Sequence, residues 1–199
     1  MKTLLATAAL AASFLAPAAA NAQAIPGAIV AVVDLDRVTG ECTACKSASA
    51  VLRGQLTSLQ SRAKTLGGPL ETEQKSIQAA IDGLQGKEPD AALKARVNAF
   101  EQKRQSTLAE LQRSQEQVQR NQAYVSQQIQ SKLGPIYQQV MQKRGANIMV
   151  EVGSTLATAQ ALDVTNDVLA AINAQLPSVS TTAPAAAAAP AQSKQPQGR

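Results

Sequence analysis

Cys42 and Cys45 form the one motif of this sequence with recognised chemistry. A C-x-x-C motif in an oxidising compartment can be a structural disulfide, a redox pair or half of a metal site. A zinc site needs further Cys or His ligands, and the chain has 2 Cys and no His. Haem attachment fails because Lys46 follows the motif where His is required. A structural disulfide is our first prediction, and reduced thiols or a redox pair remain open.

Three acidic residues, Asp34, Asp36 and Glu41, lie close together after an apolar run. They lack the dense D-x-D-x-D-G loop of a calcium site, so we expect them to act near helix N-termini. Without His, the chain also lacks the commonest general base and proton shuttle. The sequence therefore favours a protein that is not an enzyme and that has no metal or cofactor.

Basic residues gather between positions 46 and 144, where fifteen Lys or Arg stand against eight Asp or Glu. Such an excess can be a solvated helical face, or it can attract acidic proteins, unfolded chains, lipopolysaccharide phosphates or another anionic membrane surface. Nucleic acid is disfavoured because only three aromatic residues follow the leader. The candidate residues for binding such a partner are Lys75, Lys87, Lys94, Arg96, Lys103 and Arg104.

Two long helices must position these side chains. Apolar residues recur at helical spacing over residues 45–84 and 89–144, and the short connector makes a tip near residues 85–89. About forty residues at 1.5 Å each give an antiparallel hairpin arm of roughly 60 Å. We expect a kink or break at Gly67-Gly68-Pro69 and a bend at Gly134-Pro135. Polar residues on the expected seam predict a pliable arm, not a strong coiled coil.

Short apolar segments flank the arm. Residues 29–33 fit a buried strand, and residues 147–152 and 155–159 fit a strand pair around a Gly153-Ser154 turn. Residues 165–176 predict a short amphipathic helix. The fold class is α+β, mainly α, with a small body at residues 25–45 and 145–176 and the arm at 46–144. Residues 177–199, rich in Ala, Pro, Gln and Ser, are expected to be disordered.

Residues 1–24 have the pattern of a secretory signal peptide: Lys2, an apolar stretch, then small residues. An N-terminal membrane anchor is the weaker reading, because Pro17 and Asn21 leave too short an apolar span. We therefore expect export to the periplasm or the exterior. The three strands and the last helix bury too little surface to stand alone, so we also expect the body to oligomerise.

Several segments in this order resemble the OmpH/Skp family of periplasmic chaperones. They are Ala-Ile-Val-Ala-Val-Val-Asp at residues 28–34, the hairpin, Gly-Ala-Asn-Ile-Met-Val-Glu-Val at 145–152 and Leu-Asp-Val-Thr-Asn-Asp-Val-Leu at 162–169. The resemblance implies a homotrimer whose three hairpins project as tentacles around a cavity. That cavity receives unfolded outer-membrane β-barrel proteins, which pass on to the outer-membrane assembly machinery. The Cys pair, Gly67-Gly68-Pro69 and the tail depart from the family pattern.

These observations favour an ATP-independent holding chaperone, whose weak contacts are spread over a polar, basic arm. The alternative is a structural envelope protein that uses the hairpin as a spacer or adaptor. A third hypothesis, a thiol-disulfide enzyme, depends on Cys42 and Cys45 and lacks the rest of a thioredoxin-like fold.

Overall fold

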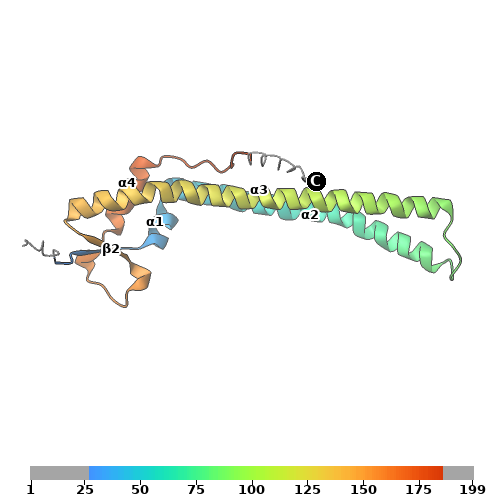
Figure 1. Ribbon diagram of the computed structural model, residues 1–199, viewed down its shortest axis with the longest axis horizontal. Helices are drawn as coiled ribbons and strands as arrows, with labels where there is room; N and C mark the ends of the chain where they lie inside the picture. Colours follow the sequence, from blue (N-terminus) through green and yellow to red (C-terminus); the bar gives the residue numbers. More distant parts are fainter. Residues whose placement is uncertain (1–26, 186–199) are drawn as a thin grey trace, which may run out of the picture.

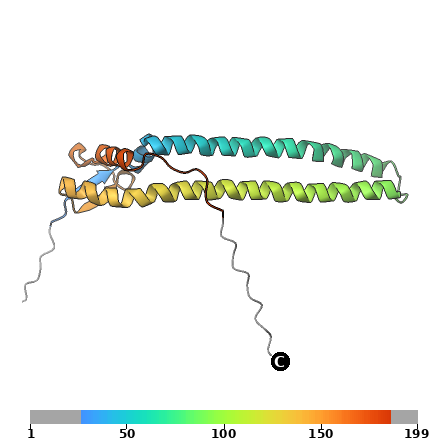
Figure 2. The same cartoon turned by 90° about the horizontal axis from the view of Figure 1, so that it is seen from above.

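The computed structural model describes residues 27–185, and the predicted signal peptide lies outside them. Two helices, α2 (Thr43–Asp82) and α3 (Ala91–Arg144), lie antiparallel and form the arm. Figure 1 and Figure 2 show the body at one end of this arm and the connector at the other. The predicted mainly helical fold with a small strand part is confirmed; the two helices have 40 and 54 residues, and residues 83–90 join them. At 1.5 Å per residue these helices are about 60 and 80 Å long.

The body contains a two-stranded parallel sheet. Strand β1 (Val30–Val33) pairs with β2 (Ile148–Glu151), and Val30 lies opposite Ile148. Parallel strands need a long crossover connection, and here the whole arm is that connection. On its other side β1 makes one isolated bridge, from Val32 to Asp163.

The predicted strand pair at residues 147–152 and 155–159 is wrong in its second half. Residues 152–154 form a short 3-10 helix, η1 (Val152–Ser154), and residues 155–159 form no strand. The hydroxyls of Ser154 and Thr155 donate to the carbonyls of Glu151 and Val152, at 2.7 and 2.8 Å. These local bonds close a turn, so the chain leaves the sheet instead of returning along β2. A second 3-10 helix, η2 (Gln160–Leu162), follows.

Two short helices complete the body. Helix α1 (Leu35–Glu41) begins at Asp34, whose side chain accepts from the Arg37 amide at 2.8 Å, as expected for a carboxylate at a helix start. Asp36 lies in the first turn of α1, whereas Glu41 lies at its end. Helix α4 (Thr165–Gln175) agrees with the predicted amphipathic helix and buries Val168 and Ile172. The main core joins β1, α1, α4 and the body ends of α2 and α3.

Neither proline interruption breaks its helix. Helix α2 continues through Gly67-Gly68-Pro69, and α3 continues through Gly134-Pro135. A proline inside a helix removes one hydrogen bond, from the carbonyl four residues earlier. Those carbonyls belong to Thr65 and Ser131, and both residues are exposed, as are the two prolines. Water can satisfy the freed carbonyls, so the predicted break does not occur.

The segment after α4 corrects the prediction of a tail that is disordered from residue 177. Residues 177–185, which we call the strap, run from the end of α4 along the arm (Figure 1). Side chains of α2 and α3 form hydrogen bonds to the strap, and Val179 packs on the body core. The rest of the predicted tail, residues 186–199, lies outside the described residues.

Candidate functional site on the helical arm

Four of the six basic residues predicted to contact clients form ion pairs with a carboxylate of the arm itself. Each of these pairs lies on exposed or half-exposed surface, where ion pairs contribute little to stability. They are Lys75 with Glu71 (2.6 Å), Lys94 with Glu88 (3.8 Å), Arg96 with Glu73 (2.6 Å) and Arg104 with Glu101 (2.7 Å).

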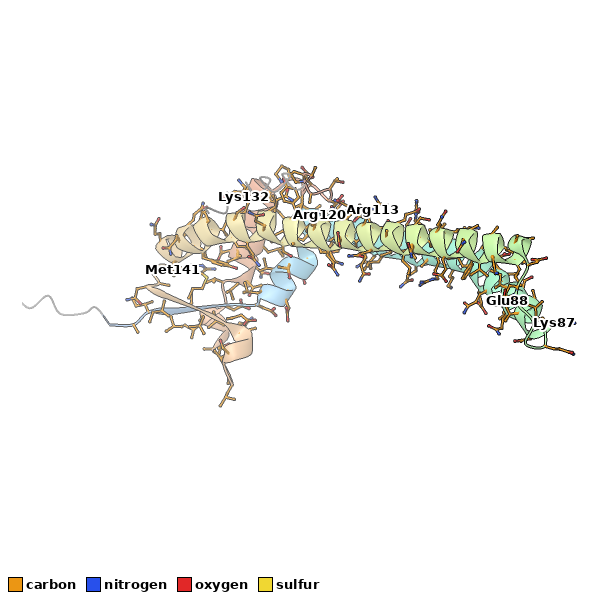
Figure 3. The ribbon with its side chains drawn as sticks, turned by 45° about the vertical axis from the view of Figure 1, so that its right-hand side comes forward. Lys87, Glu88, Arg113, Arg120, Lys132 and Met141 are labelled. Atoms are coloured by element: carbon orange, nitrogen blue, oxygen red, sulfur yellow. A yellow bond between two sulfur atoms is a disulfide. The ribbon has the colours of Figure 1, made fainter. Side chains whose placement is uncertain are left out.

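The other two predicted residues, Lys87 and Lys103, have no carboxylate within salt-bridge distance among residues 27–185. Figure 3 places Lys87 at the tip of the arm, and Arg113 and Arg120 on the middle of α3. Other Lys and Arg side chains along the arm also have no carboxylate within salt-bridge distance among residues 27–185. Their scattered positive charges are available to a partner. The further members are Lys46, Arg53, Lys64, Arg113, Arg120 and Lys132.

In two of these pairs the basic partner favours the ionised form of the carboxylate. The hydrogen bond from Lys75 lowers the pKa of Glu71, and the hydrogen bond from Arg96 lowers the pKa of Glu73. Glu73 in turn raises the pKa of Arg96. Because these groups are solvent-exposed, salt screens the pairs, and a client carboxylate can compete for the same cations.

Apolar side chains are sparse along the arm and only partly covered. Among them Ile77, Val118 and Val125 are buried between α2 and α3. Leu108 is 53% exposed and Val51 is 45% exposed. The arm therefore presents isolated apolar side chains among basic and amide groups, a surface that is suited to many weak contacts.

Amide side chains in the middle of the arm are candidate binding residues that the sequence reasoning did not single out. Asn121 is 5% exposed, and its Nδ2 donates to Oε1 of Gln55 across the two helices at 2.9 Å. Gln117, Asn121 and Gln128 lie at helical spacing on one face of α3. The helical spacing of these amides is a signal that could have identified them in the sequence. The signal is weak, because a Gln-rich helix face is just as often only exposed to solvent.

The arm and the body are joined by charge at the end of α3. Lys143 donates to Asp167 Oδ1 at 3.0 Å, and Arg144 donates to Oδ2 of the same residue at 2.7 Å. These two hydrogen bonds lower the pKa of Asp167. Asp167 belongs to α4, so the pairs link the end of the arm to the body in addition to the shared apolar core.

Cys42 and Cys45 lie in the body core and are joined by a disulfide. Cys42 is the N-cap of α2, and its sulfur accepts from the Cys45 amide at 3.2 Å. Their exposed fractions are 0% and 2%. Thiol-disulfide exchange requires a thiolate to reach one sulfur, and in this fold neither sulfur is accessible.

Within residues 27–185, no group of three or more His, Cys, Asp or Glu is placed to hold a metal ion. Nor does any helix of that range have the length and apolar character needed to cross a membrane.

Comparison with known proteins supplies the family. A family model described as outer membrane protein (OmpH-like) matches residues 29–172. No curated protein shows a significant match. Among solved structures, one from Caulobacter crescentus CB15, described as an OmpH-like outer membrane chaperone, superposes with a TM-score of 0.63 at 20% identity. The match covers 79% of this chain and 89% of that one, and at this identity it shows the fold. Since the family model spans the body and the whole arm, the chain belongs to the OmpH-like outer membrane protein family.

Proposed function

We propose that this protein is an ATP-independent holding chaperone of the periplasm, which binds unfolded outer-membrane β-barrel proteins and prevents their aggregation before membrane insertion. The observation that carries the proposal is the arm: two long helices with a thin apolar seam and scattered unpaired cations, rooted on a small body. Membership of the OmpH-like family points to the same class of client.

Many weak contacts suit a holding protein that works without ATP. Each exposed ion pair or isolated apolar side chain contributes little by itself, yet a client that touches many of them is retained. The client can also leave, because no single contact is strong. We infer that clients then pass to the outer-membrane assembly machinery, and that an anionic membrane surface or lipopolysaccharide can bind the same cations.

A homotrimer is part of this proposal, because the body leaves surface uncovered. Strand β2 pairs only with β1 among the described residues, so its second edge is unpaired. Large apolar side chains are also exposed elsewhere in the body, and Leu156 is as exposed as in an extended chain. An open edge beside apolar surface favours association with further copies of the chain. The exposed residues are Ile29, Ile148, Val152, Leu156 and Leu162.

The experiment dilutes a urea-unfolded β-barrel protein into buffer with this protein at a stoichiometric ratio and follows light scattering. We expect scattering to be suppressed, and the mass in solution to be three times that of the chain. A folded protein of any mass that leaves scattering unchanged would favour the alternative, a structural spacer or adaptor of the envelope, for which the length of the arm is the supporting observation.

The thiol-disulfide hypothesis predicts that replacing both Cys42 and Cys45 by Ser abolishes function. We expect instead that this double variant suppresses aggregation as well as the native protein. Its stability should fall by about 2 kcal/mol, the chain-entropy value for such a short loop, in a urea titration under oxidising conditions. If the double variant keeps its fold but no longer suppresses aggregation, that result would support a redox role.

A further inference from the structure

The strap lies on the arm as an extended chain. Figure 1 and Figure 2 both show it leaving α4 and running along the helices toward the middle of the arm. Val179, Thr181 and Ala183 are half-buried, whereas Ser178, Ser180 and Thr182 are exposed. This alternation is typical of an extended segment with one face against a surface.

Three amide side chains hold the strap, and all of them bind its backbone. Gln128 of α3 makes a matched pair with Ser180, since its Nε2 donates to the Ser180 carbonyl at 2.8 Å and its Oε1 accepts from the Ser180 amide at 3.0 Å. Asn121 Oδ1 accepts from the Ala183 amide at 2.9 Å, and Gln55 Nε2 donates to the Thr181 carbonyl at 3.2 Å. These bonds use only groups that every residue except proline possesses.

The amides are held in place by the arm itself. Asn121 donates to Gln55 at 2.9 Å and accepts from Gln117 Nε2 at 2.8 Å. Gln128 also donates to the carbonyl of Tyr124 at 3.1 Å. Groups that are ordered before a partner arrives lose less entropy on binding it.

The surface between α2 and α3 on which the strap lies is hollowed beyond the contacts of the strap. A cavity of about 420 Å³ lies between α2 and α3, and Gln55 and Asn121 form part of its lining. Leu59 and Val118 give it apolar surface, and Arg62 lies at its wall. A polypeptide that follows the path of the strap would have space there for an apolar or acidic side chain.

We propose that Gln55, Asn121 and Gln128 form a binding site for the backbone of an extended polypeptide, which the strap occupies until a client segment displaces it. The inference rests on the proposed function, because it names the site at which a client would compete. Recognition of backbone groups tolerates any sequence, as a chaperone for many clients requires. The half-buried strap residues are small, so the strap is a weak occupant. The strap also lies after residue 172, outside the range that matches the family model.

The test measures hydrogen exchange of the Ser180 and Ala183 amides in the full-length protein by NMR. We expect both amides to be protected, and protection of Ser180 to fall about tenfold in Gln128→Ala, which removes two hydrogen bonds. Gln127→Ala is the matched control, because Gln127 is exposed on the neighbouring position of α3. Equal protection in Gln128→Ala and Gln127→Ala would overturn the site.

Competition is tested with synthetic peptides. A peptide with the sequence of residues 177–185, and one of the same composition in shuffled order, should both accelerate exchange at Ser180 and Ala183. A peptide that is N-methylated at the positions of Ser180 and Ala183 should not, because it lacks the donors. Binding of the peptides without faster exchange would contradict the proposal while leaving the holding function intact, since light scattering tests the latter separately. Displacement of the strap without suppressed scattering would count against the holding function alone.

Discussion

At the scale of single residues, the segment at positions 163–168 shows how closely the sequence specifies the body. The Asp163 side chain accepts from the Thr165 amide at 2.8 Å, and hydrogen bonds from the Thr165 side chain and amide lower the pKa of Asp163. Thr165 Oγ1 accepts from the Asp34 amide at 2.9 Å, and Asn166 accepts from Arg37 at 2.7 Å. Asp163 therefore binds the start of α4, whereas Thr165, Asn166 and Asp167 connect α4 to other elements, which explains why a short motif was informative before the fold was known.

Replacing Thr165 by Val should destabilise the protein by about 1–3 kcal/mol. The Thr165 side chain is 1% exposed, so the change leaves the part-buried Asp34 amide without its acceptor. Urea unfolding followed by circular dichroism measures the effect. Thr165→Ser keeps the hydroxyl and should lose clearly less stability; equal losses in the two variants would show that the methyl group, not the hydrogen bond, matters.

The ion pairs of Asp167 with Lys143 and Arg144 predict how the stability of the protein changes at acidic pH. The pKa of Asp167 is lowered in the folded protein, so its contribution to stability is complete above the ordinary pKa of 3.8. It is lost as the pH falls through the lower folded value. The unfolding midpoint of the native protein should therefore fall more steeply below about pH 4 than that of Asp167→Asn, as thermal scans would show. Parallel curves for the two proteins would contradict this role.

At the scale of the elements, the arm separates its predicted cations into two kinds. Lys87 and Lys103 are without an ion pair in the described chain, whereas Lys75 and Lys94 already have partners. A client that binds a paired lysine must first compete with a carboxylate. Unpaired lysines are therefore the better contacts, although both kinds add the same net charge.

The double change Lys87→Gln and Lys103→Gln should weaken client binding by a few-fold more than Lys75→Gln with Lys94→Gln. The two variants lose the same charge, so they differ only in local contacts, which dominate at physiological salt because screening acts beyond about 8 Å. Fluorescence anisotropy with a labelled unfolded client gives the dissociation constants. Identical constants for the two variants would mean that only the total charge counts.

The elements also show what sequence periodicity can and cannot predict. The two long helices and the last short helix followed from apolar spacing, because each buries a stripe against a neighbour. Apolar spacing could not predict that β2 pairs with β1. This pairing joins segments far apart in the sequence, as the hydrogen bond between Ile29 and Asn147, 118 positions apart, shows. Sequence periodicity also could not predict that the helices continue through Pro69 and Pro135, because that depends on which helix face is exposed to water. Nor could it predict the strap, whose position depends on Gln and Asn side chains that come together only in the folded arm.

At the scale of the whole molecule, burial is distributed unevenly. Most buried apolar residues lie in the body, and the long arm buries few. The body itself has only two strands and leaves large apolar side chains exposed on residues 148–162. The molecule is a long arm on a small body, and the body would gain most stability from contacts with further copies of the chain.

Charged residues at Ile148 and Leu156 should therefore prevent association. Ile148→Lys with Leu156→Asp should lower the mass in solution from that of a trimer toward that of one chain, because a charge at an apolar interface loses its hydration. Sedimentation measures the mass. Lys64→Glu, an exposed change far out on α2, is the control and should leave the mass unchanged. An unaltered trimer in the double variant would place the interface elsewhere.

The parallel pairing of β1 with β2 also has a consequence for the order of folding. The first strand cannot find its partner until more than a hundred further residues are available, and closing so long a loop in an unstructured chain is slow. The helical hairpin shortens that search, because contacts near the tip are local and bring residues 29 and 147 together as they extend. The left-handed turn at Gly86, at the far end of the molecule, therefore influences how fast the sheet forms. The remotest point of the structure is thus a natural starting point for its assembly.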